Sequence, residues 1–170
     1  MSERAASPEP GRAWDSLARS AANAREAVDY AEDIQQLLTF ELAGAPYAIR
    51  VEHVREIVRM RPVTPVPRLP EDVRGVISLR GEMIELIDLR CRLGLGRIEP
   101  TRRTRIIVVQ AGDNDVAGVL VDAVREVLRV ADDAMRPAAG SETGAVEELC
   151  AHGDEFISLL ELERVLDCHA

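Results

Sequence analysis

Short apolar runs alternate with turn residues along most of the chain, at the two-residue period that is typical of β-strands. Between residues 38 and 51 every second position is apolar on either side of a turn at 44–46, which predicts a first hairpin. Residues 76–80 and 82–87 are two further apolar runs joined by a tight link at Gly81, which predicts a second hairpin with a positive φ at that glycine. The first half of the chain is therefore expected to be mainly β-structure.

The second half repeats this pattern beyond an arginine-dense linker at residues 97–105. Residues 106–109 form an all-apolar, β-branched run, which predicts a strand buried on both faces. The further predictions are a turn at 113–115, a returning strand at 116–121, a loop at 136–145, a last strand at 155–160 and a short closing helix at 161–168. Two clusters of short strands, each too small for a sandwich, predict two small closed barrels packed together.

Three stretches have helical features instead. Apolar residues recur three and four positions apart from residue 12 to about residue 36, which predicts an amphipathic N-terminal helix after a disordered start at 1–11. Its stripe is mostly alanine, so it is either a tether helix on its own domain or an element for self-association or partner binding. Residues 52–60 have apolar positions at helical spacing and predict a short helix. Asp88 is expected to cap a single helical turn that ends at Gly94.

Composition and charge exclude several classes of function. A net charge of −9 and an isoelectric point near 4.9 oppose binding to nucleic acid, which requires a clustered positive surface. All 21 basic residues are arginine, and the absence of lysine excludes Schiff-base chemistry and a P-loop. No apolar run approaches the roughly 18 residues of a membrane span, no signal-peptide core is present, and the three cysteines fit a reducing compartment. The expected location is the cytoplasm.

Candidate catalytic and metal sites are weak. Cys150, His152, Cys168 and His169 offer four soft ligands, but their spacing is not that of a zinc site, and we interpret them as a buried cysteine and exposed terminal residues. Paired carboxylates lie in predicted turns, where nothing shifts their pKa values towards catalytic use. We therefore predict no enzyme activity, no metal and no cofactor; a small β-barrel enzyme or metalloprotein is the alternative from another class.

A binding surface is the stronger hypothesis. Arg80 is expected on the outward face of its strand, where a guanidinium can form a bidentate pair with a partner's carboxylate. The alternative is that Arg80 holds its own loop or pairs with Glu82 or Glu56. Val54 and Ile57 share the apolar side of the predicted 52–60 helix, where they either face a partner or pack in the core.

The stretch around Arg80 contains the motif V-P-x-x-P-x-x-V-x-G-V-I-x-L-R-G followed by I-x-L-I-D-L-R-x-x-L-G, within residues 65–94. These motifs closely resemble the signature of CheW-like domains, the chemotaxis coupling proteins. Residues 38–49, 51–58 and 118–128 resemble further segments of the family in the right order. The resemblance covers roughly residues 37–167.

This resemblance implies a fold. It is mainly β, with two five-stranded β-barrels packed together around a groove, short helices and, outside the family pattern, the extra N-terminal α-helix. The CheW-like domain would span 37–168, with a first barrel at roughly 37–96, a second at roughly 104–160 and the closing helix at 161–168, while residues 1–36 would precede it.

The resemblance also implies a function. The chain would be a non-enzymatic adaptor that couples the cytoplasmic tip of a methyl-accepting chemoreceptor to the regulatory domain of a CheA-type histidine kinase, and would meet the membrane only indirectly, through receptor arrays. A scaffold of a gliding, pili or other chemosensory pathway is the alternative within the same class. The implied receptor-binding residues are Val54, Glu56, Ile57, Gly75, Arg80 and Ile106, and the implied kinase-binding residues are Arg136 and Pro137.

Overall fold

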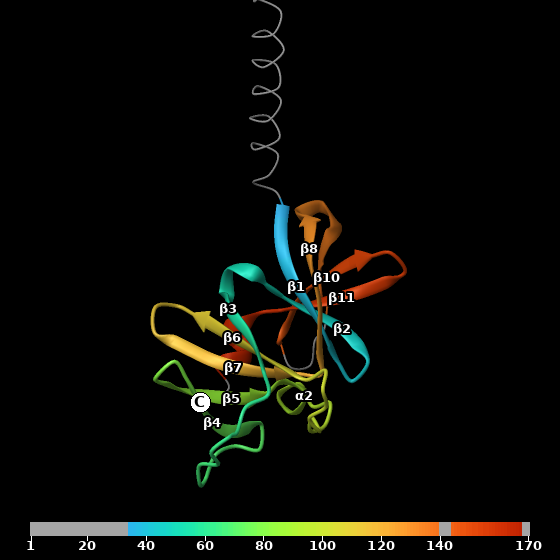
Figure 1. Cartoon of the computed structure of the whole chain (residues 1–170). Helices are drawn as coiled ribbons and strands as arrows, with labels where there is room; N and C mark the ends of the chain where they lie inside the picture. Colours follow the sequence, from blue (N-terminus) through green and yellow to red (C-terminus); the bar gives the residue numbers. More distant parts are fainter. Residues whose placement is uncertain (1–33, 140–143, 168–170) are drawn as a thin grey trace, which may run out of the picture. The chain divides into compact units, whose positions relative to one another are not determined.

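The structure is a computed structural model that describes residues 34–139 and 144–167 (Figure 1). The chain divides into two units, Met1–Ile34 and Gln35–Ala170, and the described residues belong to the second unit apart from Ile34 itself. The predicted disordered start and almost all of the predicted N-terminal helix lie outside the described residues. Positions 34–36, which we expected to end that helix, instead begin the first strand.

Two β-sheets make up the described part of the chain (Figure 1). Sheet A has the strand order β8-β1-β2-β11-β10-β9, and sheet B has the order β3-β6-β7-β5-β4. The strands of sheet A are β1 (Ile34–Leu42), β2 (Ala45–Arg50), β8 (Ala123–Ala131), β9 (Met135–Pro137), β10 (Val146–His152) and β11 (Glu155–Leu160). The strands of sheet B are β3 (Val54–Arg59), β4 (Val73–Leu79), β5 (Glu82–Asp88), β6 (Arg105–Ala111) and β7 (Asp115–Val121). The prediction of a mainly β fold with two groups of strands and short helices is confirmed.

Strand pairing corrects two details of that prediction. Each sheet takes strands from both sides of residue 100, because β11 pairs in parallel with β2 and β5 pairs in parallel with β7. The expected division into barrels at 37–96 and 104–160 is therefore wrong. The hydrogen-bonded order of each sheet also has two ends, so neither sheet closes into a complete barrel.

Two hydrophobic clusters explain this arrangement. The larger cluster joins the two sheets and includes Phe40 of β1, Leu86 of β5 and Ile106 of β6, all fully buried. The smaller cluster takes residues from all six strands of sheet A, including β8 and β9 at the opposite ends of its order. Sheet A therefore curls around a core of its own, in the manner of a barrel that hydrogen bonds do not close.

The predicted helix at 52–60 is wrong. A short 3-10 turn at Val51–His53 leads into strand β3, which pairs antiparallel with the buried strand β6. Periodicity does not separate helix from strand in so short an apolar run, and pairing with β6 decides the outcome. The predicted loop at 136–145 is also partly wrong, because Met135–Pro137 forms the edge strand β9 against β10.

Both hairpin turns have the geometry that short hairpins favour. The turn between β1 and β2 is Ala43-Gly44, one residue earlier than predicted. In the second hairpin Leu79 pairs with Glu82, and the two residues between them, Arg80 and Gly81, both have positive φ, at 51° and 81°. Positive φ at both central positions matches the right-handed twist of the strands. The predicted hairpin is confirmed, but Arg80 belongs to its turn and not to the strand.

The short helices also follow the prediction. Helix α2 (Leu89–Arg92) is capped by the Asp88 side chain, which accepts a hydrogen bond from the amide of Cys91 at 3.1 Å. Gly94 follows this helix with a φ of 74°, as the predicted C-terminal glycine. Helix α3 (Leu162–Leu166) closes the described chain.

Candidate functional site

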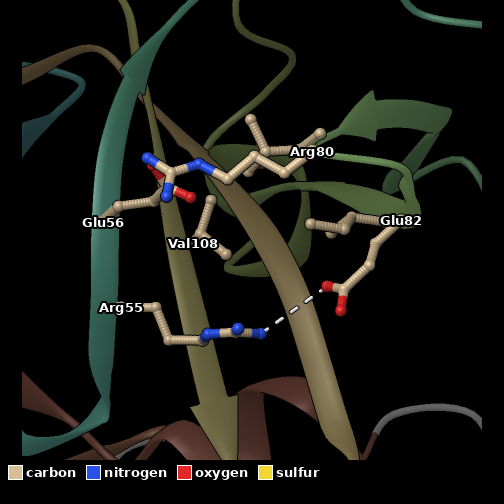
Figure 2. Close-up of a pocket in the computed structure, with 7 residues that line it drawn as sticks. Arg55, Glu56, Arg80, Glu82 and Val108 are labelled. Carbon is tan, nitrogen blue, oxygen red and sulfur yellow. Dashed lines mark hydrogen bonds and ion pairs between the residues drawn. The ribbon is translucent and has the colours of Figure 1, made fainter.

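The candidate site is an open hollow on sheet B, between strand β3 and the β4–β5 turn (Figure 2). Its volume is about 400 Å³. Three apolar side chains, Leu79, Ile84 and Val108, line it and are almost fully buried. The remaining lining residues are charged, namely Arg55, Glu56, Arg80 and Glu82. An apolar floor between charged walls suits a protein segment better than a small polar substrate.

Arg80 and Glu56 form the first charged contact across this hollow. Nη2 of Arg80 lies 3.1 Å from Oε2 of Glu56, and Figure 2 shows the guanidinium beside that carboxylate. The Arg80 side chain is 80% exposed, whereas that of Glu56 is 26% exposed. The alternative prediction of a pair with Glu56 is therefore confirmed, and the guanidinium remains on the surface, where a partner can reach it.

Arg55 and Glu82 form a second contact across the same hollow. Nη1 of Arg55 lies 3.8 Å from Oε2 of Glu82 (dashed line in Figure 2). Each pair joins β3 to the β4–β5 hairpin, at Arg80 of the turn and at Glu82, the first residue of β5. The sequence analysis did not single out Arg55, because its position opposite Glu82 depends on how β3 and β5 are placed in the sheet.

A second hollow of about 570 Å³ extends the first. The two hollows share Arg55, Glu82 and Ile84, and the second adds residues of the β6–β7 turn together with Met83. The Met83 side chain is one of the exposed large apolar groups of the described residues, at 66%. We refer to the two hollows together as the groove.

Other predicted receptor-binding residues lie outside the groove lining. Val54 is half-buried and packs against the main core. Ile57 is 41% exposed and lies on the same face of β3 as Val54, because their partners on β6, Ile107 and Val109, are two residues apart. A β-bulge between Val54 and Glu56 adds one residue to β3, so two residues three positions apart share a face of the strand.

Gly75 and Ile106 are buried. A Cβ atom at Gly75 would lie 2.2 Å from the carbonyl oxygen of Thr64, and the glycine has a φ of 139°. Gly75 therefore allows the connector before β4 to approach the strand. Ile106 is 0% exposed within the main core, so the prediction that its side chain borders a partner surface is not compatible with its position here.

The predicted kinase-binding residues lie on a different surface. Arg136 and Pro137 are exposed on the edge strand β9. Arg136 pairs with Leu149 of β10, and Ala151 of β10 pairs with Phe156 of β11, so their side chains share the outward face of sheet A. We call Arg136, Leu149 and Phe156 the outer patch.

Phe156 is a residue that the sequence analysis missed. Its side chain is 69% exposed, although its neighbour Ile157 is buried. Alternation along β11, counted backwards from the buried positions, is a signal that could have placed Phe156 on the outer face. A large exposed aromatic group in such a position is typical of a protein interface.

The cysteines show no reactive environment in the described residues. Burial raises the pKa of the Cys150 thiol. Burial and, to a lesser degree, the negative charge of Asp88 raise the pKa of the Cys91 thiol. A raised pKa keeps both thiols protonated near neutral pH. Within residues 34–139 and 144–167 no cluster of His, Cys, Asp and Glu could hold a metal ion, while Cys168 and His169 lie outside that part.

The same described ranges contain no helix that is long and apolar enough to cross a membrane.

Comparisons with known proteins agree with this geometry. Residues 36–169 match the family model described as CheW-like domain. The chain is 36% identical over 135 residues to the chemotaxis protein CheW of Rhizobium meliloti, covering 77% of this chain and 86% of that protein. It is 31% identical to protein FrzA of Myxococcus xanthus, covering 78% of this chain and 85% of that protein.

A solved structure is similar as well. The crystal structure of the scaffolding protein TtCheW from Thermoanaerobacter tengcongensis matches with a TM-score of 0.74 and 31% identity. The match covers 78% of this chain and 92% of that one. The two-sheet arrangement is therefore shared with a protein that acts as a scaffold.

Proposed function

We propose that this chain, which belongs to the CheW-like domain family, couples the cytoplasmic tip of a methyl-accepting chemoreceptor to the regulatory domain of a CheA-type histidine kinase. Members of this family are non-enzymatic adaptor and scaffold proteins of chemosensory systems. The identity of the two partners is the part that we infer, and two separate surfaces of the chain support it.

The exposed guanidinium of Arg80 at the rim of the groove is the observation that carries the receptor assignment. An apolar floor flanked by charged groups suits a helical segment that buries its apolar face and pairs its charges at the rim. Arg80 and Glu56 would contact the receptor directly, and the 41% exposed side chain of Ile57 would add an apolar contact beside the groove. Val54 and Gly75 would act by shaping the strands that carry these side chains.

The outer patch supports the kinase assignment. Phe156 of β11 supplies a large apolar contact, and Arg136 and Pro137 lie exposed on the edge strand β9, on the other side of β10. The patch belongs to sheet A, whereas the groove belongs to sheet B. Two partners would therefore bind at once, and repeated contacts in an array would make modest interfaces effective.

Substitution Arg80→Asp tests the receptor assignment. Asp tolerates the positive φ of this turn, and the side chain is exposed, so the fold is expected to be retained. Reversal of the charge should weaken binding to a soluble receptor-tip fragment by about tenfold or more, because like charges then face each other. Binding to the kinase regulatory domain should remain.

Arg68→Asp is the matched control, because Arg68 is also an exposed arginine with positive φ, at 63°, and lies outside the groove. Circular dichroism would monitor the fold, and pull-down with each partner would monitor binding. If Arg80→Asp still captures both partners as well as the control does, the proposed receptor site is wrong.

A further inference from the structure

We propose that Arg55 and Glu82 extend the receptor site beyond Arg80 and select, by charge, a docking segment that carries both acidic and basic side chains. This inference rests on the proposed function, since it concerns the same groove and the same partner. It assigns a specificity role to two residues that are identified by their contact in the structure.

The position of the Arg55–Glu82 pair is the first argument. Both residues line both hollows, together with Ile84. The pair lies where the two hollows meet, and Figure 2 shows Arg55 reaching from the β3 side towards Glu82. A segment that occupies the full length of the groove must therefore contact or displace this pair.

The weakness of the pair is the second argument. The two charged groups are 3.8 Å apart, and their side chains are 45% and 63% exposed. An ion pair this exposed contributes little to stability, and it opens without harm to the fold. Arg55 and Glu82 can therefore separate, and each can bind a charged group of the partner in place of the other.

The order of charges across the groove is the third argument. The β3 wall carries Arg55 followed by Glu56, and the facing wall carries Arg80 and Glu82. Arg80 faces Glu56, and Glu82 faces Arg55. A segment that replaces both contacts must offer acidic groups to the two arginines and basic groups to the two glutamates.

This pattern also disfavours wrong partners. A purely acidic segment would leave both glutamates facing like charge, and a purely basic segment would do the same at both arginines. Juxtaposed like charges suppress binding more effectively than missing attractions do. Met83, exposed at the edge of the second hollow, would add an apolar contact for a segment that reaches this far.

A charge swap tests the inference in the full-length chain. The double substitution Arg55→Glu with Glu82→Arg keeps one charge of each sign, so the pair can reform and the net charge is unchanged. The probe is a soluble chemoreceptor fragment from the same genome that contains the helical hairpin tip, and the readout is its dissociation constant by titration calorimetry. The swap is expected to weaken binding about tenfold. A set of fragments, each with one charged residue of the tip reversed in sign, is then titrated with the swapped chain. One or two of these fragments should recover most of the lost affinity.

The controls separate this inference from the proposed function. Arg68→Glu should bind within about twofold of the natural chain, because Arg68 lies outside the groove lining. If Arg80→Asp loses binding while the swap keeps the natural affinity, the role of Arg55 and Glu82 is wrong and the receptor site at Arg80 stands. If the swap weakens binding equally for every reversed fragment, selection by charge is wrong.

Discussion

Asp88 and Arg74 are joined inside the protein, where Nε of Arg74 donates a hydrogen bond to Oδ2 of Asp88 at 3.0 Å. The Asp88 side chain is 0% exposed, and that of Arg74 is 15% exposed. The same carboxylate accepts hydrogen bonds from the amides of Ile98 and Cys91. Arg74 also donates to the carbonyl of Ile98. Strands β4 and β5, helix α2 and the connector to β6 therefore meet at one buried charge.

Removing this carboxylate should be strongly destabilising. In Asp88→Ala, Arg74 keeps a charge with no counterion, and the cap of α2 and the amide of Ile98 lose their acceptor. Breaking one side of a buried ion pair costs about 3–5 kcal/mol. Urea denaturation followed by circular dichroism would measure the change in the free energy of unfolding. Asp113→Ala, in an exposed turn, is the control and should change it by less than about 0.5 kcal/mol. Equal stability of the two variants would contradict the role given to Asp88.

Gly75 should tolerate no side chain. In Gly75→Ala the new Cβ would lie 2.2 Å from the carbonyl oxygen of Thr64, so the backbone connector must move. The cost should be about 1–3 kcal/mol from overpacking, in addition to the strain of a positive φ. Gly153→Ala is the matched control, because Gly153 also has positive φ, at 60°, but has no atom within 4 Å of its Cβ position. Thermal unfolding of both variants would separate the two effects. If Gly75→Ala loses less stability than Gly153→Ala, the backbone at Thr64 moves aside at little cost and the predicted clash is wrong.

Phe156 should matter for partner binding and not for stability. Its side chain is 69% exposed, so Phe156→Ser should change the free energy of unfolding by no more than about 0.5 kcal/mol. Binding to the kinase regulatory domain should fall about tenfold or more if this aromatic group anchors the interface. Titration calorimetry would measure the affinity, with Val66→Ser, at another exposed apolar residue, as the control. Unchanged kinase affinity in Phe156→Ser would remove the outer patch from the proposed interface.

The thiol of Cys150 should remain unmodified until the protein unfolds. Its side chain is buried, and burial raises its pKa. Because the folded pKa lies above the unfolded one, the associated stability is fully present below the ordinary thiol pKa of about 8.5 and is lost as the pH rises above that value. Alkylation with iodoacetamide in a Cys168→Ser background, read by mass spectrometry, should modify Cys150 only in denaturant. Rapid modification of the folded protein at neutral pH would contradict this prediction.

Local predictions succeeded where neighbouring residues decide the conformation. The hairpin at Arg80-Gly81 and the capped turn from Asp88 to Gly94 each depend on contacts within a few residues. Backbone preferences of glycine and the hydrogen bond from an aspartate cap act at that range, so they can be read from the chain. The outward position of Phe156 could also be read from alternation along β11, but the sequence analysis did not use that signal.

Predictions failed where the conformation of a segment depends on pairing with a strand that is distant in the sequence. Residues 54–59 have an apolar spacing that fits a helix. They form strand β3 instead, because they pair with the backbone of the buried strand β6. In this strand Val54 packs against the core, while Ile57 on the same face stays 41% exposed. Ile106 is fully buried, as the all-apolar run at 106–109 predicts. Its assignment as a receptor-binding residue came from the family resemblance alone, which does not show that strands of the main core surround its side chain.

The sequence by itself determined the family, the mainly β character, the Arg80 hairpin and the helix cap at Asp88, because motif order and short-range periodicity carry that information. Only the tertiary structure decided which strands pair across residue 100, and with them that Glu56 faces Arg80 and Glu82 faces Arg55. Periodicity shows which face of a strand is apolar, but the identity of the neighbour across the sheet depends on pairings between distant segments, such as β3 with β6 and β5 with β7. The charges that line the groove meet only through those pairings.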